Sequence, residues 1–242
     1  MEKIITCENI KNFAYINDEI CRGNILGIVI SFFGLGTMVM FETDTTEGEF
    51  YAEKGILYVV PYNNPWAWMN KQAVNFTDEI IDVLIEKYNL SENIPIVATG
   101  GSMGGQSALV YTVYAKRQPV ACVTNCPVCD VVYHYSERKD LPRTLYSSLF
   151  NESTTLEEAL KSISPLHLAD KMPDIDYHFF HCDKDMAVNI DAHSGKMVAE
   201  MKNRNRNFTF DIVSGRGHGD LSLEMKRKFA DYTVEAIKKY NL

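Results

Sequence analysis

The chain has 242 residues, of which 46% are hydrophobic, and its formal net charge is −8 at pH 7. This apolar content suffices for one sizeable core and argues against a disordered chain. The negative charge argues against a general nucleic-acid or anionic-membrane partner. The sequence contains no internal repeat, low-complexity tract or long linker, so we expect residues 1–242 to form a single domain.

Six apolar segments of strand length follow one another along the chain. They cover residues 24–33, 56–62, 94–100, 119–125, 177–182 and 208–213. Strands that are apolar on both faces are typical of a parallel sheet covered by helices. The first 23 residues are expected to form an antiparallel lead-in to this sheet.

Helical patterns lie between these strands. Residues 77–90 have an apolar face and Thr77 as the expected N-cap, and the last helix is expected to begin at Asp220. The alternation predicts an α/β fold, with a mostly parallel central sheet and helices on both faces. Residues 133–165 are longer and less regular than the other connections, and we expect them to form a small cap insertion with short helices.

The segment IVATGGSMGGQSALVYTVYA, residues 96–115, crowds glycines around Ser102 where an apolar strand meets a helical pattern. It fits the G-x-S-x-G nucleophile elbow, in which a sharp strand-to-helix turn exposes a serine hydroxyl. The strained turn leaves no room for side chains two residues before and after the serine. The alternative is a glycine-rich helix entry that binds phosphate or only turns. However, neither the G-x-G-x-x-G nor the G-x-x-x-x-G-K-S/T pattern is present.

A serine nucleophile needs a base that takes its proton and an acid that orients the base. In the elbow architecture the acid follows the serine and the histidine comes last. Of six histidines, only His218 follows the last predicted strand, in a glycine-flanked turn. The alternative for His218 is an exposed loop histidine. Asp183 and Asp185 follow the strand at 177–182. We favour Asp185 because it lies deeper in the turn, and Asp183 is the reserve that would otherwise cap the turn.

Three segments, GGSMGG, SPLHLADKMPDIDYHFFHCDKDMAV and GRGHGD, resemble serine hydrolases of the α/β-hydrolase superfamily. They are most similar to compact esterases and to the catalytic domain of prolyl-oligopeptidase-like proteins. The resemblance implies an α/β-hydrolase fold over most of the chain. Its H-G-x-x-D-x-x-V stretch independently supports Asp185. The chain departs from the family pattern at Cys182, where relatives usually have glycine. It departs again at SFFGLGT, where many have His-Gly.

The resemblance also implies where an oxyanion would be held. The backbone N–H of Met103 would pair with the N–H of Gly34 or Leu35, and the missing His-Gly leaves the choice between these two open. Such donors stabilise the charge that develops in acyl transfer.

Large side chains follow two of the strands at the same edge of the predicted sheet. Trp66 and Trp68 are the only tryptophans. They either wall a substrate pocket or pin their loop to the core. Tyr133 and His134 are weaker candidates for this pocket, for which a structural role is favoured.

The segment CVTNCPVC contains Cys122, Cys126 and Cys129. A zinc site usually needs four ligands, often as two separated pairs, and no second pair follows. Structural thiols are therefore expected, with a redox-sensitive pair or a metal site as the alternatives. The N-terminal residues lack the pattern of a signal peptide, and the longest apolar run is too short to span a bilayer. With six cysteines, these features predict a cytoplasmic protein with reduced thiols.

These residues together predict a serine hydrolase that cleaves a small carboxylic ester through an acyl-enzyme, without a metal or organic cofactor. An ester is favoured because the chain lacks the large extra domain by which prolyl-oligopeptidase-type peptidases restrict access. The alternatives are a small peptidase or amidase, a binding protein with an idle triad, and haloperoxidase-like or acyltransferase chemistry. The acyl and alcohol groups and the oligomeric state stay open.

Overall fold

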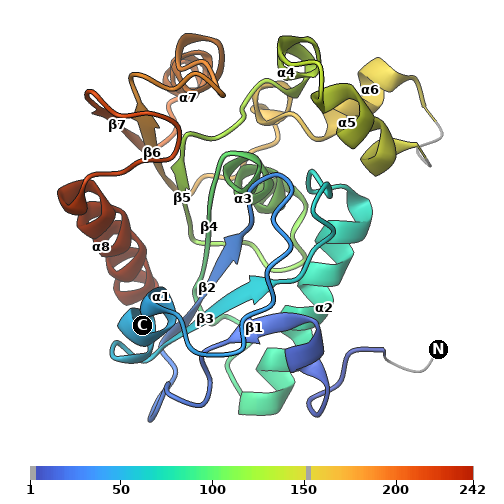
Figure 1. Cartoon of the computed structure of the whole chain (residues 1–242). Helices are drawn as coiled ribbons and strands as arrows, with labels where there is room; N and C mark the ends of the chain where they lie inside the picture. Colours follow the sequence, from blue (N-terminus) through green and yellow to red (C-terminus); the bar gives the residue numbers. More distant parts are fainter. Residues whose placement is uncertain (1–3, 151–153, 242) are drawn as a thin grey trace.

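The structure is a computed structural model that describes residues 4–150 and 154–241. Its strands form one sheet in the order β1-β3-β2-β4-β5-β6-β7 (Figure 1). They are β1 Ala14–Ile16, β2 Gly27–Phe32, β3 Ile56–Pro61, β4 Ile96–Gly101, β5 Ala121–Asn125, β6 Asp176–Cys182 and β7 Phe208–Val213. β1 pairs antiparallel with β3, and the other neighbours pair parallel. The predicted α/β class, its strands and the antiparallel lead-in are confirmed.

Helices cover both faces of this sheet. They are α1 Thr46–Ala52, α2 Lys71–Tyr88, α3 Met103–Tyr114, α4 Val131–Glu137, α5 Leu141–Leu149, α6 Leu156–Ser162, α7 Lys196–Asn203 and α8 Leu223–Tyr240. Figure 1 shows α1 and α8 on one side of the sheet and α2 and α3 on the other. None of the helices in the described ranges combines the length and apolarity needed to cross a bilayer.

Alternate residues of each strand pack into different halves of the core. In β2, Val29 packs in a cluster with Tyr51 of α1 and Ile237 of α8. Its neighbours Ile28 and Ile30 belong to the cluster that contains the buried faces of α2 and α3. The side chains of Ile28, Val29 and Ile30 are all fully buried. The strand sequence is therefore continuously apolar because both faces of the sheet are covered.

The helix α2 begins earlier than the sequence predicts. Its N-cap is Asn70, whose side chain accepts a hydrogen bond from the Ala73 N–H. Thr77, the expected N-cap, lies inside the helix, where its hydroxyl donates to the Ala73 carbonyl at 2.8 Å. The prediction was wrong because Asn70 and Thr77 are both good capping residues. In the folded chain, Asn70 is the one that accepts from a free N–H group of the first turn.

The last helix begins later than predicted. Its N-cap is Ser222, not Asp220, and the Ser222 hydroxyl accepts from the Met225 N–H at 3.2 Å. Helices α1 and α7 were not predicted at all. Each is short, and α1 contains Gly48, which weakens its helical pattern.

Helices α4, α5 and α6 lie together beyond the end of the sheet, as expected of a small cap (Figure 1). Residues 151–153 of the predicted cap segment lie outside the described residues. The helix expected in TLEEALKSI is α6, where Thr155 and Glu158 form a capping box. The cap helices and the loop after β3 bury a separate apolar cluster that contains Trp68 and Met103. This cluster adjoins the serine elbow, because Met103 directly follows Ser102.

Candidate active site

Ser102 lies in the sharp turn between β4 and α3, as the sequence predicts. Its φ of 57° and ψ of −123° are rarely adopted by residues other than glycine. A Cβ added to Gly100 would lie 2.3 Å from the carbonyl oxygen of Gly104. A Cβ added to Gly104 would lie 2.1 Å from the carbonyl oxygen of Phe32. Glycine two residues before and after Ser102 is therefore a steric requirement of the turn.

Backbone hydrogen bonds fix the Ser102 turn from both sides. The Ser102 N–H donates to the Asn125 carbonyl at 2.9 Å, and the Ser102 carbonyl accepts from the N–H of Gln106 and of Val128. The hydroxyl makes no hydrogen bond to the first turn of α3. The backbone of Ser102 is thus fully engaged, while its hydroxyl is free for chemistry.

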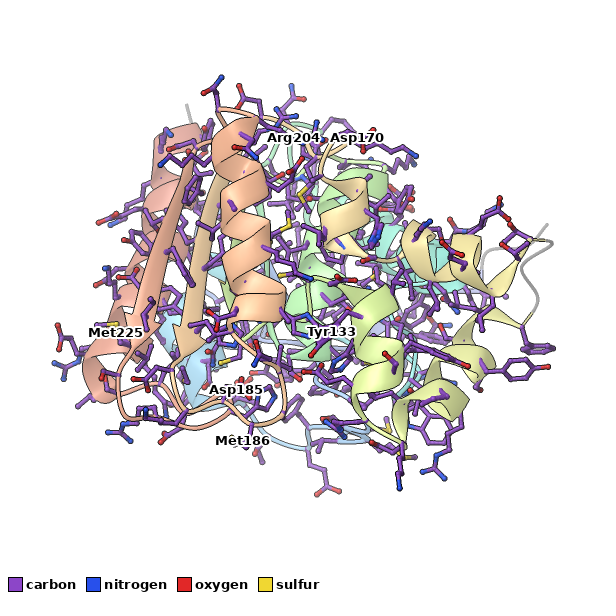
Figure 2. The ribbon with its side chains drawn as sticks, turned by 90° about the horizontal axis from the view of Figure 1, so that it is seen from above. Tyr133, Asp170, Asp185, Met186, Arg204 and Met225 are labelled. Carbon is purple, nitrogen blue, oxygen red and sulfur yellow. The ribbon has the colours of Figure 1, made fainter. Side chains whose placement is uncertain are left out.

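His218 and Asp185 meet at the same edge of the sheet. Nδ1 of His218 lies 2.6 Å from Oδ2 of Asp185. The Asp185 side chain is fully buried and that of His218 is 31% exposed. Figure 2 shows Asp185 in the loop after β6, beside the outward-pointing Met186. Within the described residues, no hydrogen bond joins the Ser102 hydroxyl to His218.

The Asp185 carboxylate is surrounded by N–H donors. Oδ1 accepts from the N–H groups of Ala187 and Val188 at 2.8 and 2.9 Å. Nε2 of His181 lies 3.5 Å from Oδ2. Burial alone would raise the pKa of Asp185, but the bonds from His181, His218 and the backbone outweigh it and hold the pKa well below its usual range. The carboxylate is therefore ionised at neutral pH.

His218 has the opposite shift. The hydrogen bond to Asp185, with a further one to the Cys126 thiol, raises the pKa of His218 to about 9. Cys126 directly follows β5 and is fully buried. The CVTNCPVC pattern groups Cys126 with Cys122 and Cys129 and does not predict this contact. The signal that could have found it is its place at the end of the strand next to the Ser102 strand.

Asp183, the reserve acid, contacts the turn that carries His218 instead of the ring. Its Oδ1 accepts from the Gly215 N–H at 2.7 Å, and its Oδ2 accepts from the Ser214 hydroxyl at 3.3 Å. Asp183 therefore caps the turn that carries His218, whereas the alternative left by the sequence was a cap of its own turn after β6.

The N–H groups predicted for the oxyanion hole lie close to the elbow. Met103 is the first residue of α3, so its N–H has no acceptor within the helix. A Cβ added to Gly34 would lie 3.9 Å from the Gly101 carbonyl oxygen. In the part of the chain that the structure describes, neither Gly34 nor Leu35 donates a backbone hydrogen bond. The fold thus leaves all three N–H groups available.

A cavity of about 520 Å³ opens beside the elbow, between α1, α8 and the sheet. Its walls include Gly100 and Gly101 of β4 and Gly219, which follows His218. Phe50 of α1 and Phe229 of α8 also line it. This volume and apolar lining are typical of sites for small molecules.

The tryptophans and Tyr133 lie elsewhere. Trp66 lines a smaller cavity of about 210 Å³, with the Arg143 guanidinium 5.5 Å from its ring. Trp68 is 1% exposed, and its Nε1 donates to the Thr144 hydroxyl at 3.1 Å. This placement of Trp68 fits a side chain that pins its loop to the core. Tyr133 is exposed on α4 (Figure 2). Neither they nor His134 line the cavity beside the elbow.

His134 belongs to a buried cluster with Glu137 and His193. His134 Nδ1 and His193 Nε2 lie 2.6 and 3.1 Å from the same Glu137 oxygen. His193 Nδ1 accepts from the N–H groups of Cys129 and Asp130, so its Nε2 carries a proton and donates to Glu137. Burial lowers the pKa of His134 to about 4, so its ring is neutral. A metal ion would need a lone pair on His193 Nε2, which here carries a proton. The cluster is therefore a hydrogen-bonded one rather than a good metal site.

All six cysteines are described and are free thiols. Cys122 and Cys129 are fully buried, and burial raises the pKa of both thiols. Both have the environment expected of structural thiols.

Comparison with protein families matches residues 62–239 to the prolyl oligopeptidase family. The chain belongs to this family. Prolyl oligopeptidase family members are serine hydrolases of the α/β-hydrolase superfamily, which the three sequence segments resemble. No curated protein matches the sequence.

Solved structures agree in fold. A puromycin-hydrolysing peptidase of Mycobacterium tuberculosis has a TM-score of 0.73 at 14% identity; the match covers 90% of this chain but 35% of the peptidase. An S-formylglutathione hydrolase from Agrobacterium tumefaciens has a TM-score of 0.67 at 14% identity, over 94% of this chain and 87% of that one. A truncated carbohydrate esterase from gut microbiota has a TM-score of 0.65 at 18% identity, over 91% and 87%. These likenesses establish the α/β-hydrolase fold.

Proposed function

We propose that this family member hydrolyses small carboxylic esters, with Ser102 as nucleophile, His218 as base and Asp185 as the acid that orients the base. The observation that supports this most strongly is the 2.6 Å bond between His218 and Asp185. It lies at the edge of the sheet where Ser102 has the strained elbow conformation. A carboxylate in this position holds the imidazole tautomer and stabilises the imidazolium that forms.

The reaction follows the chemistry of such a triad. His218 accepts the Ser102 proton while the serine oxygen attacks the carbonyl carbon. The N–H of Met103, with that of Gly34 or Leu35, stabilises the oxyanion. His218 then gives its proton to the leaving alkoxide, which departs as the alcohol. Water attacks the acyl-enzyme with His218 again as base, which releases the acid and restores Ser102.

Two features support an ester substrate. The S-formylglutathione hydrolase and the carbohydrate esterase both align over 87% of their own length, and the second is named an esterase. The cavity of about 520 Å³, which is lined by Gly101 and Gly219, the neighbours of Ser102 and His218, is large enough for a small acyl or alcohol group.

A peptidase or amidase is the second candidate. It is favoured because the chain belongs to the prolyl oligopeptidase family.

The test compares wild type and Ser102→Ala on p-nitrophenyl esters from acetate to octanoate and on matching p-nitroanilides. We expect wild type to prefer the esters and Ser102→Ala to lose activity by a factor of about 10⁴ or more, because no other group replaces the nucleophile. Ser107→Ala on the same helix is the matched control and should remain active.

The ratio of ester to anilide turnover decides between the two candidates. A folded wild-type protein that hydrolyses neither substrate and is not labelled by a serine-directed phosphonate would contradict both. The binding-protein alternative would then take their place.

A further inference from the structure

The geometry points to Asn125 as a positioning residue that holds the His218 turn in register with the Ser102 elbow. This inference rests on the proposed function, since it assigns Asn125 a role in the encounter between nucleophile and base. Asn125 is the last residue of β5 and pairs with Gly101 of β4, the residue before Ser102. Among the described residues it makes no hydrogen bond to the side chain of Ser102, His218 or Asp185, so it would act through the backbone on either side.

Asn125 is hydrogen-bonded to both halves of the candidate site. Its carbonyl accepts the Ser102 N–H at 2.9 Å. Its side-chain Nδ2 donates to the Gly219 carbonyl, also at 2.9 Å. Gly219 directly follows His218 in the sequence. A single residue therefore links the backbone of the nucleophile to the backbone beside the base.

The turn that carries His218 needs such a link. Gly215 and Gly219 have φ of +72° and +73°, and a Cβ added to Gly215 or Gly217 would have no atom within 4 Å. Packing therefore does not hold this turn, and hydrogen bonds must do so. The Lys184 N–H donates to the Arg216 carbonyl at 2.9 Å. That bond ties the turn to the Asp185 side of the site, whereas the Asn125 amide ties it to the Ser102 side.

The chemistry of the Asn125 side chain fits this role. The Gly219 carbonyl requires a donor, and an amide supplies one, whereas an aspartate of the same shape offers only acceptors. The other amide atom of Asn125, Oδ1, is buried without a partner in the described residues. An unpaired buried acceptor lowers stability. A position that served stability alone would be better filled by an apolar side chain, so the useful part of Asn125 is its N–H group.

The expected consequence is on turnover. General-base catalysis requires His218 within hydrogen-bond reach of the Ser102 hydroxyl. A misplacement of about 1 Å costs a factor of about 10² in rate. Loss of the Asn125 bond should therefore lower kcat. Asn125 also lines the cavity beside the elbow, so KM is measured separately, and a positioning role predicts that KM changes much less than kcat.

The experiment measures kcat, KM, the pH profile and the melting temperature of Asn125→Ala and of the isosteric Asn125→Asp with p-nitrophenyl acetate. We expect kcat to fall 10- to 100-fold, on the order of the misplacement effect, with KM within about twofold of wild type. The rising limb of the pH profile of Asn125→Ala should keep its position, because the bond between Asp185 and His218 is intact. Assays run well below the melting temperature of each variant, so that unfolding cannot mimic the effect.

Thr124→Val is the matched control. Thr124 is the preceding residue of β5, and its buried hydroxyl has no partner in the described part of the chain. This variant should keep the wild-type kcat. If both Asn125 variants retain kcat within about twofold of wild type, or if Thr124→Val loses as much as they do, Asn125 has no positioning role. A wild type that is inactive and unlabelled by a phosphonate would instead overturn the proposed function itself.

Discussion

Ser102 and His218 are held at the same edge of the sheet by contacts of different kinds. The Ser102 elbow is closed by backbone packing. A Cβ at Gly100 or Gly104 would lie within 2.3 Å of a carbonyl oxygen. The His218 turn is open, and a Cβ at Gly217 would meet no atom within 4 Å. This turn is held by hydrogen bonds from distant residues instead.

The two halves of the site are therefore specified in different ways. The elbow needs residues without side chains where its backbone packs against itself and against Phe32, so it leaves a short pattern of glycines in the sequence. The turn depends on Asp183, Asp185 and Asn125, which lie far away in the sequence. We therefore expect the elbow to be disrupted by an added side chain, and the turn to be disrupted by the loss of a distant hydrogen-bond donor or acceptor.

The largest effect is expected where the turn loses its principal acceptor. Asp185→Asn should lower kcat by about 10⁴-fold, because an amide favours the wrong imidazole tautomer and cannot stabilise the imidazolium. Steady-state kinetics on p-nitrophenyl acetate measure the loss. Asp183→Asn is the matched control, since Asp183 bonds to Gly215 and not to the ring. Equal losses in both variants would mean that Asp185 only shapes the loop.

A smaller effect is expected on stability, where an added methyl group should distinguish the packed elbow from the open His218 turn. Gly104→Ala should lower the free energy of unfolding by about 3 kcal/mol or more, because its Cβ would meet the Phe32 carbonyl oxygen and the backbone must move. Gly217→Ala should change it by less than about 0.5 kcal/mol, because its Cβ points into open space. Urea denaturation followed by circular dichroism compares the two. Similar values for both variants would remove the contrast between a packed elbow and an open turn.

The same contrast explains what the sequence could predict of the fold. Five of the six parallel strands, β2 to β6, were predicted because they are mostly buried on both faces and are therefore nearly continuously apolar, whereas the edge strand β7 is only half-buried. The start of α2 was missed because Asn70 and Thr77 are both good caps, and only the folded chain shows which side chain reaches a free N–H. Helix α7 was missed because it buries only two side chains, those of Met197 and Met201, which make a weak helical pattern.

For the candidate site, the sequence placed Ser102 from a local pattern and His218 and Asp185 from their order after the strands. The contacts of Cys126 and Asn125 with the His218 turn could not be read in this way. They depend on the pairing of β5 with β4 and β6, which brings together residues that are distant in sequence. The sequence left open whether Trp66 and Trp68 wall a substrate pocket, whereas the cavity beside the elbow lies between α1, α8 and the sheet.

The smallest effect concerns the pH dependence of the base. His218 must be neutral to accept a proton, so kcat/KM should rise with pH as the ring loses its proton, with a midpoint near its pKa of about 9. The Cys126 thiol is the second group that raises this pKa, after Asp185. Cys126→Ala should therefore move the rising limb to lower pH. The Cys122→Ala variant should leave the limb in place, because Cys122 is buried in the cluster on the α2 and α3 side. A limb that stays in place in Cys126→Ala would show that Asp185 alone sets the basicity of His218.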